Sequence, residues 1–242
     1  RLHESDVWDL KTGDRHFVTR NGSSIIAFVV GSESLANSGM RMAGAHTDSP
    51  CLMVKPQPEI NQSGYFQLGV EVYGGALLNP WFDRDLSIAG RLVYRDADQQ
   101  LKQTAVDFKE PVAMIPSLAI HLDREANSGR TVNAQKHIPP VLMLAPQADA
   151  KTDFRALLAE KFLPAKSEVL DFELCFYDTQ PAAMVGLKQE FLASARLDNL
   201  LSCYVATQAL LAADGTNTSL MVCNDHEEVG SQSACGAQGP ML

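Results

Sequence analysis

The sequence lacks long hydrophobic runs, clusters of basic residues and closely spaced cysteines. No segment approaches the ~18 consecutive apolar residues that a transmembrane helix requires, so we expect no membrane partner. The chain has 20 Lys and Arg residues against 29 Asp and Glu residues, and its net charge of -9 argues against binding to nucleic acid. No internal repeat or low-complexity segment is present. The acidic charge by itself indicates nothing about the substrate.

The five cysteines are scattered, and most of them lie in apolar segments. This distribution is typical of reduced thiols in a cytoplasmic protein, and no pair has the spacing of a thiolate zinc site. No basic start leads into an apolar segment, so we expect no signal peptide. Because the sequence begins with Arg1 rather than Met, we also expect that an N-terminal piece is missing.

A hydrophobic share of 45% and a charged share of 20% over 242 residues predict one large or two modest folded domains. The first part has the pattern of an α/β domain. Residues 15–31 predict a hairpin that turns at Asn21-Gly22, and Met40–Ala45 predicts a buried strand. The last part has the same pattern, because residues 219–224 form another apolar run that predicts a buried strand.

The middle of the sequence has a different pattern. Residues 65–75, 86–94 and 169–177 alternate between apolar and polar side chains, and prolines punctuate the region, which predicts an antiparallel β module. One helix is predicted over residues 153–163. The simplest organisation is an α/β domain interrupted by a mostly β insertion. Its expected segments are 1–56 (α/β domain), 57–190 (inserted) and 191–242 (α/β domain).

His46-Thr47-Asp48 directly follows the first predicted buried strand. Residues i and i+2 of a strand point to the same side, so His46 and Asp48 can share a face at the strand end. In open α/β sheets ligand sites gather there, and a carboxylate often orients a metal-bound histidine. A polar turn with no ligand is the alternative interpretation.

Asp225-His226-Glu227-Glu228 follows the second predicted buried strand. The adjacent carboxylates of Glu227 and Glu228 repel each other, and a dication would relieve that repulsion. One carboxylate could bind the metal while its neighbour accepts a proton from a metal-activated water. A solvated acidic turn is the alternative.

Asp198 stands at the start of a predicted helix whose apolar residues recur at helical spacing up to Asp214-Gly215. An aspartate there is ordinarily an N-cap, which is the alternative to a metal ligand. A carboxylate has two oxygens and can bridge two metal ions. Histidine, aspartate and glutamate from three element ends form a donor set that suits zinc.

The segments "GAHTDSP", "SARLDNL" and "NDHEEVGS" together resemble the aspartyl aminopeptidase family, metallopeptidase family 18. Further segments resemble that family in the same order, including "VTRNGSSIIAFVVG", "FQLGVEVYGGALLNPWFDRDLSIAGRL" and "IPSLAIHLDREAN". The resemblance covers nearly the whole chain. It implies a three-layer, mixed-sheet α/β catalytic domain that binds zinc, with an inserted β domain used for dimerisation.

The resemblance also implies roles for individual residues. His46 would bind one zinc ion, Asp198 would bridge two, and Glu228 would bind the other. Glu227 would be the general base, and Asp48 would steady His46. In related two-zinc peptidases the peptide bond after the bridging aspartate is often cis, so a cis bond is expected between Asp198 and Asn199.

Other features are implied at the level of the assembly. The family places a histidine of the inserted domain in a neighbouring subunit's active site, and His121 matches that position. The alternative for His121 is a partly buried strand residue. The family needs two further metal ligands, an acidic residue and a histidine, which would lie beyond Leu242 in a longer protein. The expected oligomer is a tetrahedral dodecamer built from dimers.

The expected function is hydrolysis of the N-terminal peptide bond of peptides with a free N-terminus, with preference for Asp or Glu at that position. Two zinc ions per active site would activate a water, and Co²⁺ or Mn²⁺ could substitute for zinc. Two alternatives stay open: a related zinc amidohydrolase, such as a carboxypeptidase or deacylase, and a non-catalytic assembly scaffold.

Overall fold

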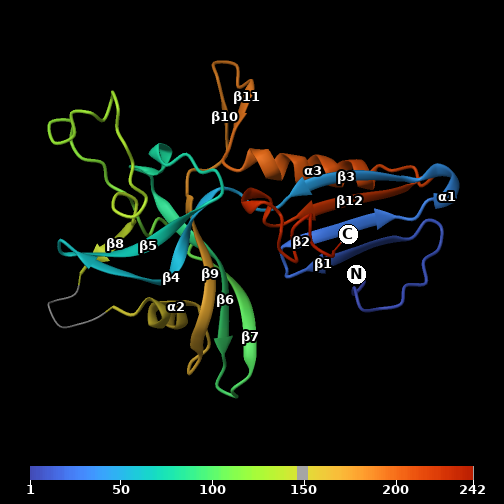
Figure 1. The fold of residues 1–242 in the computed structure, drawn as a ribbon, viewed down its shortest axis with the longest axis horizontal. Coiled ribbons are helices and arrows are strands. Elements are labelled where there is room, and N and C mark those ends of the chain that lie inside the picture. Colours follow the sequence, from blue (N-terminus) through green and yellow to red (C-terminus); the bar gives the residue numbers. More distant parts are fainter. Residues whose placement is uncertain (146–151, 242) are drawn as a thin grey trace. The chain divides into compact units, whose positions relative to one another are not determined.

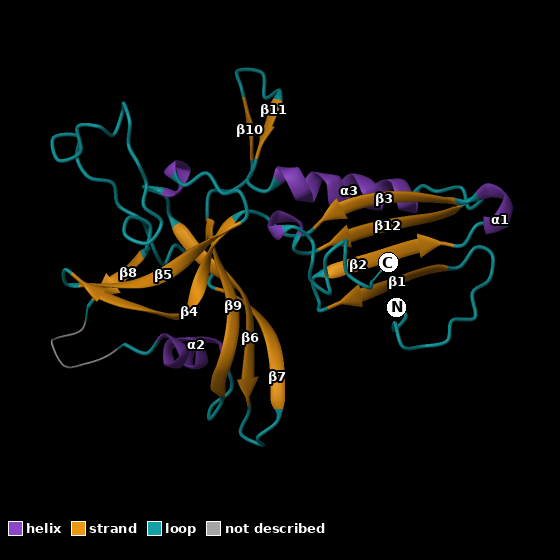
Figure 2. Cartoon of the chain, in the orientation of Figure 1, coloured by secondary structure: helices purple, strands orange, loops and turns teal. Residues whose placement is uncertain are grey.

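The computed structural model describes residues 1–145 and 152–241, which form two compact units. The first unit joins Arg1–Ser49 to the segment that starts at Ala183, and the second is Pro50–Ala182. Figure 1 follows the chain through both units, and Figure 2 shows their helices and strands. No helix among the described residues is long and apolar enough to cross a membrane.

The first unit contains a four-stranded sheet in the order β1-β2-β12-β3. Its elements are β1 (Arg15–Arg20), β2 (Ser24–Val29), α1 (Leu35–Ser38), β3 (Met40–His46), β10 (Ala183–Val185), β11 (Phe191–Ala193), α3 (Leu197–Leu211), β12 (Thr218–Asn224) and the 3-10 turn η2 (Glu227–Val229). The predicted hairpin is confirmed, since β1 and β2 pair antiparallel. Asn21 and Gly22 have φ values of 53° and 70° in its turn, the left-handed region that Asn-Gly adopts readily.

Strand β12 lies between β2 and β3, and it pairs antiparallel with β2 and parallel with β3. In the parallel pair Asn224 is the partner of His46, so both strands end at the same edge of the sheet. β12 is buried, as predicted. The burial predicted for β3 was wrong, since Met40 and Met42 are 43% and 61% exposed. β3 is the edge strand of this sheet as described, and it therefore has only one neighbouring strand to cover it.

Helix α3 covers one face of the sheet (Figure 1) and packs against β3 and β12. Ala206 of the helix meets Met221 and Cys223 of β12 in a small core. The opposite face is partly covered by the N-terminal segment, where Trp8 stacks on Phe28 of β2 with ring centroids 5.9 Å apart. Helix α3 is thus packed against the two parallel strands, β3 and β12.

The helix predicted after Asp198 is confirmed, but its ends differ from the prediction. α3 ends at Leu211, earlier than the Asp-Gly signal at 214–215. The N-cap residue is Arg196, in the left-handed conformation with φ 61°, and Asp198 lies in the first helical turn. The N-cap interpretation of Asp198 was therefore wrong, and its carboxylate is not used to cap the helix.

The second unit is built on a six-stranded antiparallel sheet in the order β7-β6-β9-β4-β5-β8. Its elements are β4 (Cys51–Gln62), β5 (Tyr65–Tyr73), the 3-10 turn η1 (Asn79–Trp81), β6 (Leu86–Arg95), β7 (Leu101–Asp107), β8 (Val141–Leu144), α2 (Phe154–Phe162) and β9 (Glu168–Asp178). The three alternating segments are confirmed as β5, β6 and β9. The helix predicted over 153–163 is confirmed as α2, whose N-cap Asp153 accepts a hydrogen bond from the Ala156 N–H.

The core of the second unit lies between its sheet and α2. Phe154 and Leu158 of α2 are buried there with Phe176 of β9. Close approach of β6 and β9 requires glycine at position 90, because a Cβ atom there would lie 2.0 Å from the Glu173 carbonyl oxygen. This unit therefore has its own hydrophobic core, separate from the α3 core of the first unit.

Candidate metal centre

His46 is the last residue of β3, and the turn that follows it is fixed to the end of β12. The Thr47 N–H donates to the Asn224 carbonyl oxygen at 2.7 Å. The Thr47 hydroxyl donates to the Ser23 carbonyl oxygen at 2.9 Å. These bonds hold the main chain directly after His46, and the pairing of β3 with β12 holds the main chain before it, so the ring leaves the sheet edge in a defined direction.

The contacts of the His46 ring define which nitrogen is available to a metal. Nδ1 lies 3.1 Å from the Asp48 backbone carbonyl oxygen and 3.5 Å from Asp48 Oδ1. A carbonyl oxygen only accepts hydrogen bonds, so Nδ1 carries the proton. Nε2 then keeps its lone pair, and it lies 3.7 Å from Oδ2 of Asp198. This is the arrangement in which an oxygen acceptor orients a ligating histidine.

Asp48 connects His46 to the glutamate pair. Its side chain is only 6% exposed. Oδ1 accepts the Glu227 N–H and Oδ2 accepts the Glu228 N–H, each at 3.1 Å. The buried carboxylate of Asp48 therefore fixes the position of the η2 backbone, and the same carboxylate also lies beside the His46 imidazole.

The loop that carries Glu227 and Glu228 is shaped by polar contacts on its other side. The Ser24 hydroxyl donates to the Cys235 carbonyl oxygen and accepts the Asp225 N–H. His226, with a left-handed φ of 65°, places its Nδ1 2.6 Å from the Ser233 hydroxyl. Because these groups are buried or half-buried, their bonds define how the loop turns after β12.

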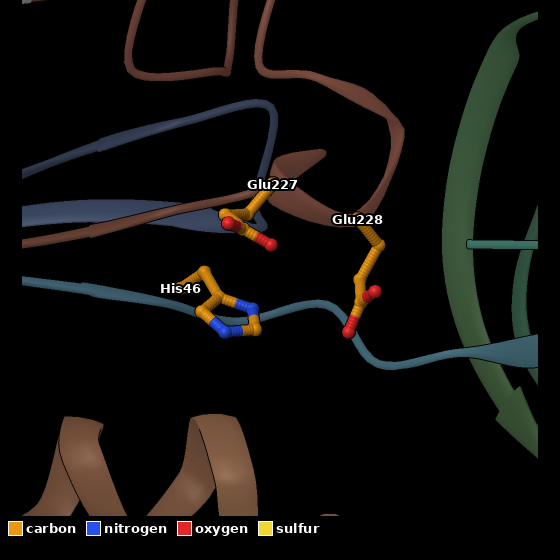
Figure 3. A group of neighbouring side chains, drawn as sticks. All are labelled: His46, Glu227 and Glu228. Carbon is orange, nitrogen blue, oxygen red and sulfur yellow. The ribbon is translucent and has the colours of Figure 1, made fainter. Parts of the chain in front are cut away.

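Ligand atoms of His46, Glu227 and Glu228 all lie within 4.8 Å of one another. Figure 3 shows the two carboxylates directed toward the imidazole from the turn after β12. Asp198 reaches the same imidazole from the first turn of α3, and its side chain is 84% exposed. The structure thus brings His46, Glu227 and Glu228 into one group, Asp198 contacts only the His46 member of that group, and Asp48 contacts His46 and the backbone of both glutamates.

These residues fit zinc by the chemistry of their donor atoms. One imidazole nitrogen and several carboxylate oxygens are ordinary zinc donors, and the imidazole is already oriented by oxygen acceptors. Glu227 and Glu228 bring negative charge close to this histidine, and Asp198 adds more on the Nε2 side of the ring. A divalent cation would offset that charge.

Two further predictions concern His121 and the peptide bond that follows Asp198. His121 lies on an exposed turn of the second unit, so its interpretation as a partly buried strand residue was wrong. The turn that contains it is closed by the hydrogen bond from the Leu122 N–H to the Ala119 carbonyl oxygen. The cis bond expected after Asp198 was also wrong, because no cis peptide bond occurs in the described residues. Asp198 and Asn199 both lie in α3, and helical geometry requires trans bonds.

Sequence reasoning missed the polar residues whose hydrogen bonds hold the segments that carry the site residues. These are Ser24, Ser49, Asn199, His226 and Ser233. Asn199 had one signal, its position next to Asp198, although helix α3 contains other polar residues such as Ser202 and Gln208. The serines had none, because serine is common in ordinary turns.

The imidazole and carboxylate donors lie at the ends of two parallel strands, the edge of an α/β sheet where ligand sites gather. A family model described as "Aminopeptidase I zinc metalloprotease (M18)" matches residues 1–242. The chain therefore belongs to this family, and the resemblance seen in its motifs is confirmed.

Relatives agree with this assignment. The chain is 61% identical over 247 residues to a "Probable M18 family aminopeptidase 2" of Pseudomonas putida KT2440, and 58% identical to a protein of the same description from Azotobacter vinelandii. Each match covers 100% of this chain and 57% of the relative. The chain therefore spans somewhat more than half the length of these curated relatives.

Solved structures match as well. The chain superimposes on a protein in "Cryo-EM structure of the Ape4 and Nbr1 complex" with a TM-score of 0.89 and 36% identity, covering 100% of this chain and 51% of that one. It matches mApe1 of Chaetomium thermophilum with a TM-score of 0.88 and 33% identity, covering 100% of this chain and 58% of that one. The predicted mixed-sheet α/β peptidase fold is confirmed.

Proposed function

We propose that this protein is a two-zinc aminopeptidase that hydrolyses the first peptide bond of peptides with a free N-terminus. The observation that carries the proposal is the convergence of His46, Glu227 and Glu228 within 4.8 Å, with Asp198 on the same imidazole. Membership of the zinc metalloprotease family supports the choice of metal. Co²⁺ and Mn²⁺ would replace zinc in the same donor set.

The proposed ligands come from three separate elements. His46 would bind one zinc ion through Nε2, Asp198 would bridge the pair, and Glu228 would bind the second ion. An acidic residue and a histidine would complete the coordination. When bound, the metal pair would lower the pKa of a water molecule in the site and polarise the scissile carbonyl group.

Glu227 is the proposed general base. Its backbone is held by Asp48, and its carboxylate lies in the ligand cluster. Glu227 accepts a proton from the attacking water, whose oxygen forms a bond to the carbonyl carbon. As the C–N bond breaks, Glu227 returns the proton to the leaving amine nitrogen. The acidic surroundings favour a substrate ammonium group nearby, which restricts cleavage to the N-terminus.

The second unit is proposed to mediate subunit contacts. His121 would enter the active site of a neighbouring subunit and stabilise the oxyanion. The mApe1 protein of S. cerevisiae is described as a dodecamer, and we propose a tetrahedral dodecamer built from dimers for this protein. A cytoplasmic location and a preference for N-terminal Asp or Glu complete the proposal.

Chelation tests the metal requirement. Exhaustive dialysis of the full-length protein against a chelator should abolish turnover, and added Zn²⁺ or Co²⁺ should restore it. Full activity after removal of all bound metal contradicts the mechanism.

Substrate chemistry tests the reaction class. Peptides with a free N-terminal Asp or Glu should be cleaved, and the same peptides with an acetylated N-terminus should not. Cleavage of the acetylated peptides alone would instead identify a deacylase or carboxypeptidase. Metal binding without cleavage of either set would identify a scaffold.

A further inference from the structure

Asn199 is an unusual residue for its place in the structure. It lies in the first turn of α3 and is only 1% exposed, whereas the other buried residue of that helix is Ala206. Burying an amide without hydrogen-bond partners destabilises a folded protein. A buried asparagine beside Asp198 therefore requires specific partners, and their identity indicates what it does.

Both partners of Asn199 belong to the turn that follows His46. Its Nδ2 donates to the Thr47 carbonyl oxygen at 3.1 Å. Its Oδ1 accepts the Ser49 hydroxyl at 2.8 Å. A carbonyl oxygen can only accept, so the amide nitrogen must face Thr47 and the orientation of the side chain is fixed.

A second contact of α3 reaches the same turn. The Cys203 thiol donates to the His46 carbonyl oxygen at 3.1 Å. Residues 199 and 203 are four apart on the helix and share a face, so the helix is attached at two successive carbonyl groups, those of His46 and Thr47. Thr47 is in turn bonded to Asn224 at the end of β12. The helix that carries Asp198 is thus tied directly to the main chain that carries His46.

We propose that Asn199 is a positioning residue for the metal centre: its buried amide fixes the separation between Asp198 and His46. This inference rests on the proposed function, because it takes both side chains as ligands. Asp198 Oδ2 lies 3.7 Å from His46 Nε2. The Asp198 side chain is too exposed to be held in place by packing. The exposed carboxylate therefore depends on its backbone for its place, and the neighbouring Asn199 sets that backbone.

Zinc affinity is the measurement that separates positioning from folding. Asn199→Ala removes both hydrogen bonds, and Ser49→Ala removes only the one to Oδ1. Residues that orient ligands typically contribute about 10–100-fold to metal affinity. Titration of Zn²⁺ against a chromophoric chelator should show a loss of that size in Asn199→Ala and a smaller loss in Ser49→Ala. The visible absorption of the Co²⁺-loaded protein should also change in Asn199→Ala.

Thr218→Val is the matched control. Thr218 is 7% exposed, and its hydroxyl accepts the Gly31 N–H at 3.0 Å at the beginning of β12, away from the Asn224 end. This variant should lower the melting temperature and keep the parental zinc affinity. If both Asn199→Ala and Ser49→Ala bind Zn²⁺ with the affinity of the parent protein, the inference is overturned. If Asn199→Ala does not fold, Ser49→Ala decides by the same comparison.

The outcome also distinguishes this inference from the proposed function. A parent protein that binds no Zn²⁺ overturns the proposed function, and the positioning role with it. A parent that binds Zn²⁺ with the same affinity as both variants overturns the positioning role alone.

Discussion

The carboxylate of Asp48 accepts the backbone N–H of Glu227, with Oδ1 and N 3.1 Å apart. The same carboxylate accepts the next N–H, that of Glu228, through its other oxygen. The single carboxylate of Asp48 therefore positions the backbone of both the proposed base, Glu227, and the proposed metal ligand, Glu228. Its backbone carbonyl also faces Nδ1 of His46, so three parts of the site depend on a single residue.

Asp48→Asn should weaken zinc binding about 10–100-fold. The substitution preserves shape, but the new amide NH₂ faces an N–H donor and cannot accept it. A hydrogen bond to a buried charged group is worth about 1.5–3 kcal/mol. Zinc titration checks the result. Asp123→Asn, in a half-buried ion pair with Arg130 of the second unit, is the control and should bind zinc normally. Equal affinity in Asp48→Asn and the parent contradicts the prediction.

Glu227→Gln should leave zinc stoichiometry intact and reduce turnover by about 10²–10⁴-fold, the usual contribution of a general base. Glutamine keeps the size of the side chain but cannot accept the proton of the attacking water. Metal analysis and steady-state kinetics on the same sample provide the two measurements. Turnover within a few-fold of the parent would rule out this residue as the base.

Glu228→Ala should lose bound zinc together with activity, because the substitution removes a ligand oxygen. Metal content after dialysis against metal-free buffer checks it. Retention of stoichiometric zinc in both Glu228→Ala and Glu227→Gln would remove support for the assignment of ligand and base. Excess Zn²⁺ in the assay should restore part of the activity of Glu228→Ala and none in Glu227→Gln.

Cys223 should resist alkylation in the native protein. Burial, together with a hydrogen bond to Cys203, raises the pKa of the Cys223 thiol to about 12. The thiolate is the reactive form, so iodoacetamide at pH 8 should label Cys223 only after denaturation. The neutral thiol stabilises the fold up to the ordinary thiol pKa of 9.0, and that contribution falls as the pH rises toward 12. Peptide mapping by mass spectrometry checks the labelling, and rapid native labelling at pH 8 would contradict it.

Much of the fold follows from local pattern. The Asn21-Gly22 turn, the alternating segments of the second unit and the helices α2 and α3 all depend on neighbours in sequence, and sequence predicted them. The motif residues were identifiable because each follows an apolar strand or opens a helix. These residues approach one another because β3 and β12 end at the same edge of the sheet. That pairing belongs to the tertiary structure, and local sequence pattern does not reveal it.

The errors have physical reasons. The exposure of Met40 and Met42 depends on β3 having a single neighbouring strand, which composition does not reveal. Arg196 in a left-handed conformation begins α3, and an arginine carries no capping signal, so the sequence left the N-cap open as an alternative for Asp198. The hydrogen bonds of Asn199 and Ser49 join residues 150 positions apart, a distance at which local pattern has no information.

Pairing of His46 with Asn224 has a consequence for how the chain folds. Side chains alternate between the faces of a strand, so a slip of β3 by one residue along β12 would turn the imidazole to the other side of the sheet. Such a misaligned chain would have no imidazole facing the glutamate turn. Zinc uptake would then favour the native alignment by mass action, and metal present during refolding should increase the yield of correctly paired protein.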